Sequence, residues 1–216
     1  MRLANIVGVL AAGSVLLLGS ACGGSSVTMR PAPRAFTASD YDNVYEAWTR
    51  EADVFAFGSL TDVLNVTGTF QGWEFRWAYV VRYADDHGFR TEDRADMLRA
   101  SLADARQRHR FFVTISGRRW RETNLASDDS AWRVLLVDEE DDQTVPLEVE
   151  LLHRPGANIA SYYPSVTTFR QAFRIVFPSH REDGTAVIPD NARFVILRFT
   201  GPLGTVDLKW EFAHSN

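Results

Sequence analysis

Five consecutive acidic residues, Asp138 to Asp142, form the segment of this sequence best suited to binding a cation. Calcium prefers six to eight oxygen ligands, and carboxylates on a loop supply such oxygens. We therefore take Asp138, Asp141 and Asp142 as candidate calcium ligands and predict no other metal or cofactor. The run lacks the glycine-spaced order of an EF-hand loop, so a solvated hairpin tip that discourages edge pairing is the alternative interpretation.

A second segment combines planar cations with an aromatic ring. Its residues are Arg118, Arg119, Trp120 and Arg121. Guanidinium groups bind phosphate and carboxylate, and an indole ring stacks on a sugar or on arginine. The pattern predicts an anion- or glycan-binding patch, and residues 76–121 carry 11 arginines against six acidic residues. The alternative is that these arginines pair with nearby acidic side chains and that Trp120 packs against the core.

Net charge and the motifs that the sequence lacks narrow the classes of function. The chain of 216 residues carries 23 basic and 28 acidic residues, and its net charge of -5 argues against a nucleic-acid partner. Its five histidines form no His-Glu-x-x-His pair, and no Gly-x-Ser-x-Gly motif or phosphate-binding glycine loop occurs. We therefore predict no catalytic residues from motifs, and a non-enzymatic role is favoured.

The N-terminal segment predicts export from the cytoplasm. Arg2 gives a positive start, residues 6–18 are uncharged and mostly apolar, and small residues follow. This order is typical of a secretory signal peptide. The apolar stretch is shorter than the roughly 20 residues that a transmembrane helix needs. We expect the signal peptide to cover residues 1–21.

The only cysteine of the chain follows this segment directly. The sequence Leu18-Gly19-Ser20-Ala21-Cys22 resembles the lipobox of bacterial lipoproteins, with the leucine one place farther from the cysteine than is usual. The resemblance implies that Cys22 carries a diacylglycerol and that the chain is cut before it. It also implies the outer membrane, because Gly23 stands where an aspartate would signal the inner membrane. Several acyl chains anchor a protein firmly, since each buried methylene contributes about 0.8 kcal/mol.

Composition divides the mature chain into a tether and one domain. Residues 22–35 are rich in glycine, serine and proline, which is typical of a flexible linker with a stiffer far end. Residues 36–216 have the length of a single domain, and at 45% hydrophobic residues the chain can bury an ordinary core. The strand patterns described next make this domain β-rich.

Hydrophobic periodicity predicts a mainly β fold with two helices, near residues 40–54 and 92–108. Most other segments alternate apolar and polar residues, which is typical of antiparallel strands with one face in water. The predicted strands cover residues 60–70, 73–83, 111–115, 132–136, 145–151, 169–177, 193–200 and 206–212. About eight strands favour an antiparallel two-sheet sandwich of the immunoglobulin-like class, and a curled β-barrel is the alternative.

These features together predict a lipid-anchored protein of the bacterial envelope. Its partners would be the membrane, through the N-terminal lipid, and an unknown protein or envelope polymer that the domain binds without catalysis. The alternative is an envelope glycan or ester hydrolase that uses carboxylates such as Asp128 and Asp138, or a histidine such as His180. Catalytic carboxylates of a glycosidase would have to lie about 5–9.5 Å apart, with a raised pKa on one of them.

Overall fold

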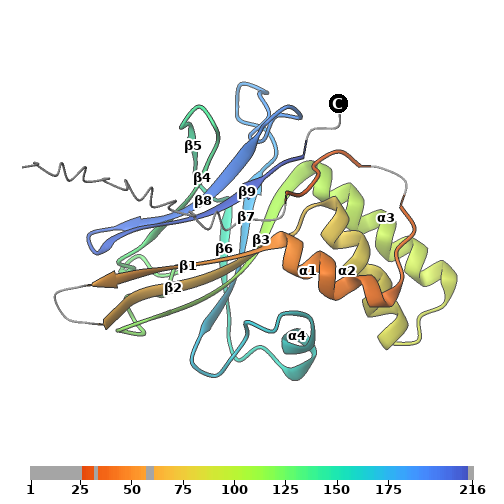
Figure 1. The fold of residues 1–216 in the computed structure, drawn as a ribbon, viewed down its shortest axis with the longest axis horizontal. Helices are drawn as coiled ribbons and strands as arrows, with labels where there is room; N and C mark the ends of the chain where they lie inside the picture. The colour runs from red at the N-terminus through yellow and green to blue at the C-terminus, as the bar shows by residue number, and fades with distance from the viewer. Residues whose placement is uncertain (1–25, 32–33, 57–60, 214–216) are drawn as a thin grey trace, which may run out of the picture.

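The computed structural model describes residues 26–31, 34–56 and 61–213. Residues 1–21 and Cys22, on which the predicted signal peptide and lipid anchor fall, lie outside these described residues. The described chain forms two antiparallel β-sheets with helices gathered mainly at one end (Figure 1). The site considered below depends on how these sheets end, so the strands are described first.

Five strands form the first sheet and four form the second. In spatial order the first sheet contains β1 (Thr49–Ala56), β2 (Thr61–Phe70), β3 (Arg108–Gly117), β7 (Gln171–Pro178) and β6 (Glu148–Leu152). The second contains β5 (Gln143–Thr144), β4 (Arg133–Val137), β8 (Phe194–Gly201) and β9 (Gly204–Glu211). Within the described residues the sheets do not close into a barrel, so the predicted two-sheet sandwich is confirmed.

The core lies between the two sheets, and one face of each of β3 and β9 contributes apolar side chains to it. On β3 these residues are Phe111, Val113 and Ile115, and on β9 they are Val206, Leu208 and Trp210. β8 and β9 form the predicted hairpin, in which Gly201 pairs with Gly204. Because strand side chains alternate between faces, the remaining positions of β9 point into water. The period-two patterns of the sequence were therefore a correct guide to these strands.

Over the residues that the structure describes, four α-helices accompany the sandwich: α1 (Tyr41–Trp48), α2 (Trp73–Asp86), α3 (Thr91–Gln107) and α4 (Ala157–Tyr162). Helix α3 confirms the prediction for residues 92–108, and α1 shows that the prediction for 40–54 was too long. The chain leaves the helix after Trp48 because Thr49 begins a ladder with Thr69 of β2, and the two hydroxyls lie 2.9 Å apart. Pairing in the sheet therefore overrides the helical spacing of the later apolar residues.

Helix α2 replaces the strand predicted over residues 73–83. Its sequence contains Tyr79, Val80, Val81 and Tyr83, residue types that favour strands. The helix is also buried on more than one side, since α1 and α3 both pack against it. A helix buried in this way has no continuous polar face, so its sequence lacks the 3.6-residue hydrophobic periodicity by which an amphipathic helix is predicted.

Two other strands begin later than predicted, and α4 was not predicted at all. β6 starts at Glu148 rather than 145, and Val145 and Leu147 before it are exposed. β7 starts at Gln171 rather than 169, and Phe169 is exposed. These differences leave apolar side chains in solvent just before β6 and just before β7.

The segment before α1 packs on the domain. The N–H of Val27 donates to the carbonyl of Glu211 at 2.9 Å, and the N–H of Ala213 donates to the carbonyl of Val27 at 2.8 Å. The indole N–H of Trp73 donates to the carbonyl of Thr28 at 2.9 Å. The described part of the predicted tether, 22–35, is therefore held on the domain from Val27 onward, and we call residues 27–31 the strap.

Candidate functional site

A wide cleft lies where the loop after β3 meets the segments after β6 and before β7. Its volume is about 980 Å³. The lining includes Trp120, Asn124, Arg154 and Gln171, with an apolar floor that contains Leu151. We call it the Trp120 cleft, because this indole is 56% exposed on its wall.

The backbone at Trp120 is held rigidly although its side chain is exposed. The side-chain amide of Gln171 donates to the carbonyl of Trp120 and, at 3.0 Å, to the hydroxyl of Thr123. The Thr123 hydroxyl in turn donates to the same carbonyl at 3.1 Å. An exposed ring on a fixed backbone loses little conformational freedom when it stacks on a ligand, which favours binding.

Gln171 is the first residue of β7, opposite Ile115 of β3. The residue is only 2% exposed, and its Oε1 has no hydrogen-bond partner within the described residues. Buried polar groups are nearly always paired, so an unpaired acceptor on a cleft wall is available to a ligand hydroxyl or amide. The amide nitrogen of Gln171 thus holds the Trp120 backbone, while its buried oxygen has no hydrogen-bond partner within the described residues.

A smaller depression of about 230 Å³ lies beside the cleft. It shares Trp120, Asn124 and Gln171 with the cleft and adds Arg121 and Ser127. Trp120 therefore borders both hollows. A ligand of several units can lie across the indole and reach polar groups on either side.

The Trp120 cleft is lined by arginines and by no acidic residue of the described chain, whereas the smaller depression contains Glu122 and Asp129 as well as Arg121. The guanidinium groups of Arg121 and Arg154 have no ion pair or hydrogen bond in the described part of the chain. Arg170, by contrast, donates to the Thr67 hydroxyl at 2.9 Å and to the Thr114 carbonyl at 3.1 Å. Burial lowers the pKa of Arg170, and nearby Glu51 opposes this effect. The cleft therefore offers exposed positive charge to a carboxylate or phosphate.

The structure brings together part of the predicted anion- or glycan-binding patch. Trp120 lines both hollows and Arg121 lines the smaller one. Arg119 is paired with Glu122 at 2.9 Å, and Arg118 is exposed outside both hollows. Sequence reasoning missed Gln171, Asn124 and Arg154, and its only available signal was that Gln171 interrupts an alternating apolar pattern.

The acidic run folds around one of its own carboxylates. Asp138 Oδ1 accepts the backbone N–H groups of Glu140 and Asp142 at 3.0 and 2.9 Å. Its Oδ2 accepts Arg181 Nη2 at 2.6 Å, and the side chain is 4% exposed. Both oxygens are therefore engaged within the protein.

The carboxylates that come within 4.8 Å of one another are Asp138, Glu140 and Asp142. Asp141 was predicted as a ligand but does not belong to this group. It adopts a positive φ of 66°, and its carboxylate lies 3.7 Å from Arg198. Glu140, which was not predicted, takes its place.

The groups named for the hydrolase alternative do not converge on the Trp120 cleft. Asp138 pairs with Arg181, His180 hydrogen-bonds Ser179 at 2.9 Å, and none of Asp128, Asp138 and His180 lines the cleft. Each carboxyl pKa that is shifted in the described residues is shifted downward, as for Asp104, whose pKa falls to about 2 beside Arg110 and Arg76. A general acid requires a shift in the opposite direction.

Comparisons with protein family models, curated proteins and solved structures find no match for this chain. Among the helices that the structure describes, none has the length and apolar character needed to cross a membrane. The geometry of the Trp120 cleft is therefore the main guide to function.

Proposed function

We propose that this protein is a lipid-anchored envelope protein that binds a glycan polymer through the Trp120 cleft without catalysing a reaction. The observation that carries the proposal is the exposed indole of Trp120, fixed by a buried amide that keeps an unpaired acceptor. A sugar ring presents an apolar face for stacking and hydroxyls around its edge. Both parts therefore find a partner within one cleft.

The dimensions and charge of the cleft support a polymer with carboxylates. The cleft and the smaller depression meet at Trp120, so successive sugar units have adjacent places to lie. Arg154 on one side and Arg121 on the other provide unpaired guanidinium groups for acidic substituents. A small molecule would use only one of these hollows.

The predicted anchor is compatible with this role. If Cys22 carries lipid, four residues separate it from Val27, which is fixed on the domain, and the five steps from Cys22 to Val27 span at most about 18 Å. The strap docks beside the end of β9 near the helices, whereas Trp120 follows the opposite end of β3 (Figure 1). We infer that this short tether would direct the cleft away from the bilayer, toward envelope polymers.

The binding proposal is tested by sedimentation with purified bacterial peptidoglycan, an insoluble glycan polymer that carries carboxylates. We expect wild-type protein to co-sediment in a saturable way. Trp120→Ala should weaken binding at least tenfold, because an aromatic hot spot typically contributes about 2 kcal/mol or more. Arg118→Gln is the matched control, since Arg118 is exposed nearby but lines neither hollow.

Binding that survives Trp120→Ala unchanged would contradict the assignment of the cleft. If a crosslinked protein rather than a glycan depended on Trp120, the ligand class would be wrong but the site correct. The anchor has its own test: intact mass of the membrane-extracted protein should show acyl groups on a chain that begins at Cys22. A Cys22→Ser variant should then be released from membranes.

A further inference from the structure

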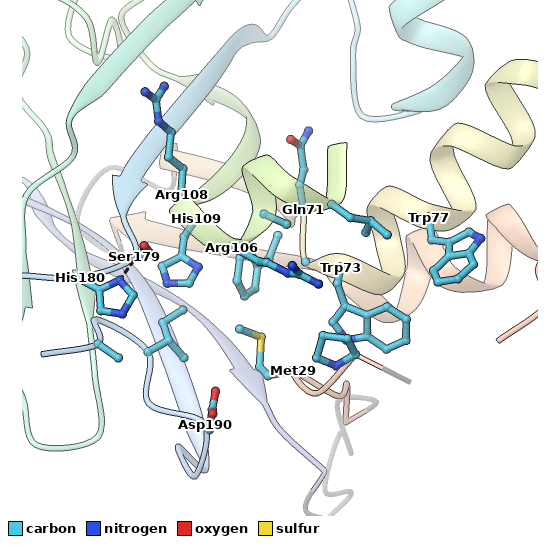
Figure 2. A pocket seen from close by; sticks show the side chains of 17 residues that line it. Met29, Gln71, Trp73, Trp77, Arg106, Arg108, His109, Ser179, His180 and Asp190 are labelled. Carbon is cyan, nitrogen blue, oxygen red and sulfur yellow. Dashed lines mark hydrogen bonds between the residues drawn. The ribbon is translucent and has the colours of Figure 1, made fainter. Parts of the chain in front are cut away.

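A second pocket lies at the opposite end of the sandwich from Trp120, and it shares no lining residue with the Trp120 cleft. Its volume is about 280 Å³ (Figure 2). Helices α2 and α3, the start of β3, the segment 179–190 and the strap all contribute walls. We call it the His109 pocket.

Most of its lining is apolar and much of it is aromatic. Trp73 and Trp77 of α2 face each other edge to face with ring centroids 6.4 Å apart. Other apolar side chains of the lining include Met29, Phe70, Leu102 and Ile188. An apolar ligand group of modest size would be desolvated here, and rings would find favourable edge contacts.

Neither arginine that lines the pocket, Arg106 or Arg108, has an ion pair or a side-chain hydrogen bond within the described residues, and the two point in different directions (Figure 2). Figure 2 shows the Arg106 guanidinium reaching toward Trp73, whereas the Arg108 guanidinium points away and Asp190 lies on the opposite side. Over the described residues, Arg106 has no ion pair or side-chain hydrogen bond. The nearest acidic residue on the same helix, Asp104, already holds Arg76 at 2.6 Å and Arg110 at 2.7 Å. A charged group above an apolar pocket favours an anionic ligand.

His109 supplies a neutral polar group at the same place. The residue is 8% exposed, and its Nε2 has no hydrogen-bond partner in the part of the chain that the structure describes. Burial, with the charges of Arg76 and His180, lowers the pKa of His109 to about 4. The ring is therefore uncharged at neutral pH, and it leaves Arg106 as the anion-binding group. An unsatisfied buried nitrogen is a group that a bound molecule can pair with.

We propose that the His109 pocket binds a small apolar monocarboxylate, such as an aryl or short acyl acid. Its carboxylate pairs with Arg106 and its apolar body lies against Trp73 and Trp77. A volume of about 280 Å³ corresponds to roughly nine water molecules at about 30 Å³ each, which suits a ligand of about ten non-hydrogen atoms. This inference does not depend on the proposed glycan site.

Isothermal titration with phenylacetate tests the proposal directly, because this acid has ten non-hydrogen atoms, about the number estimated above. We expect saturable binding and a change in tryptophan fluorescence. Phenylacetamide has the same shape without the charge and should bind at least tenfold more weakly. Arg106→Gln should weaken phenylacetate binding at least tenfold, and Arg94→Gln, an exposed arginine of the same helix, should leave it unchanged.

Three results would overturn the proposal: no saturable binding of phenylacetate or octanoate at millimolar concentration, equal affinity for the amide, or full affinity in Arg106→Gln. Binding of octanoate alone, weakened by Arg106→Gln, would support the acyl form of the ligand. Trp120→Ala should retain phenylacetate binding, so failure of the glycan site and failure of this pocket are distinguishable.

Discussion

Trp48 and Trp120 show how differently one residue type is used in this protein. Trp48 ends α1, at the end of the sandwich where α1, α2 and α3 gather (the helical end), and Trp120 lies in the loop after β3, at the opposite end (the loop end; Figure 1). Trp48 is 0% exposed, and its indole N–H donates to Glu74 at 3.0 Å. Its carbonyl accepts the indole N–H of Trp210 at 2.8 Å, and its ring meets Phe70 edge to face. Trp120 is mostly exposed and has no ring contact within the described residues. The Trp48 side chain is therefore buried and hydrogen-bonded, whereas the Trp120 ring is exposed to solvent.

This difference separates the residues that hold the fold from those that are free to bind. At the helical end, Glu74 is buried and is shared by Arg34 and Trp48. At the loop end, the buried amide of Gln171 fixes a backbone and keeps an unpaired acceptor. Substitution of Trp48 should therefore affect stability, whereas substitution of Trp120 should affect affinity.

The largest expected effect is on Trp48. Trp48→Ala should lower the free energy of unfolding by about 3–5 kcal/mol, because it leaves a cavity among buried aromatic rings. It also removes a donor from the buried carboxylate of Glu74. Urea unfolding measures this change. In the same assay Trp120→Ala should stay within about 0.5 kcal/mol of wild type, as surface substitutions usually do. Equal destabilisation by both would show that Trp120 is a structural residue.

His109 should make the stability of the helical end depend on pH. Its pKa falls from 6.5 to about 4 on folding, so the unfolded chain takes up the proton first as pH decreases. The folded protein should therefore lose about 3 kcal/mol between pH 7 and pH 4, since each pKa unit is worth about 1.4 kcal/mol. Asp104, whose pKa is lowered to about 2 from 3.8, acts only below this window.

Unfolding free energies at several pH values test this expectation. In His109→Gln the loss between pH 7 and pH 4 should be smaller by about 3 kcal/mol than in wild type. His153→Gln is the matched control at the loop end, where the histidine is exposed on the Trp120 cleft. A wild-type slope that persists in His109→Gln would place the titrating group elsewhere.

The sandwich itself was predictable because its strands obey a local rule. In β9 buried residues alternate with exposed ones, so the sequence of these eight residues is enough to predict a strand. Helix α2 was not predictable in this way, since its burial depends on α1 and α3. Likewise the sequence of residues 40–54 does not indicate that Thr49 pairs with Thr69, which lies twenty residues later in the chain. Errors thus arose where distant segments decide the local structure.

The same distinction applies to the candidate site. Trp120 was found because arginines flank it in the sequence. Gln171 lies 51 residues away, and only the fold brings its amide to the Trp120 carbonyl. For the acidic run, composition suggested three ligands, but the turn around Asp138 exchanges Asp141 for Glu140. Residue type predicted the chemistry, and loop geometry decided which side chains meet.

The buried Asp138 carboxylate should matter less than Trp48 but more than any surface charge. Asp138→Asn should cost about 1–3 kcal/mol, because it weakens the acceptor of two backbone N–H donors and removes the carboxylate closest to Arg181. Glu140→Gln, an exposed member of the same cluster, is the control and should change stability little. Urea unfolding measures both variants.

Calcium binding by the acidic run is tested with the same variants. Because Arg181 already occupies one oxygen of Asp138, we expect millimolar calcium to leave the wild-type melting temperature nearly unchanged. A clear rise in melting temperature that disappears in both Asp138→Asn and Glu140→Gln would contradict this expectation. It would identify the acidic run as a calcium site.

The smallest expected effect is on the exposed ion pair beside the Trp120 cleft. Arg119 Nη1 lies 2.9 Å from Glu122 Oε1, and the Arg119 side chain is mostly solvent-exposed. Exposed pairs typically contribute about 0–1 kcal/mol, so Arg119→Gln should change stability by no more than about 0.5 kcal/mol. Binding to peptidoglycan should fall less than twofold, in contrast to Trp120→Ala. A large loss of affinity in Arg119→Gln would mean that Glu122 releases this arginine to the ligand, and the binding surface would then extend beyond the two hollows.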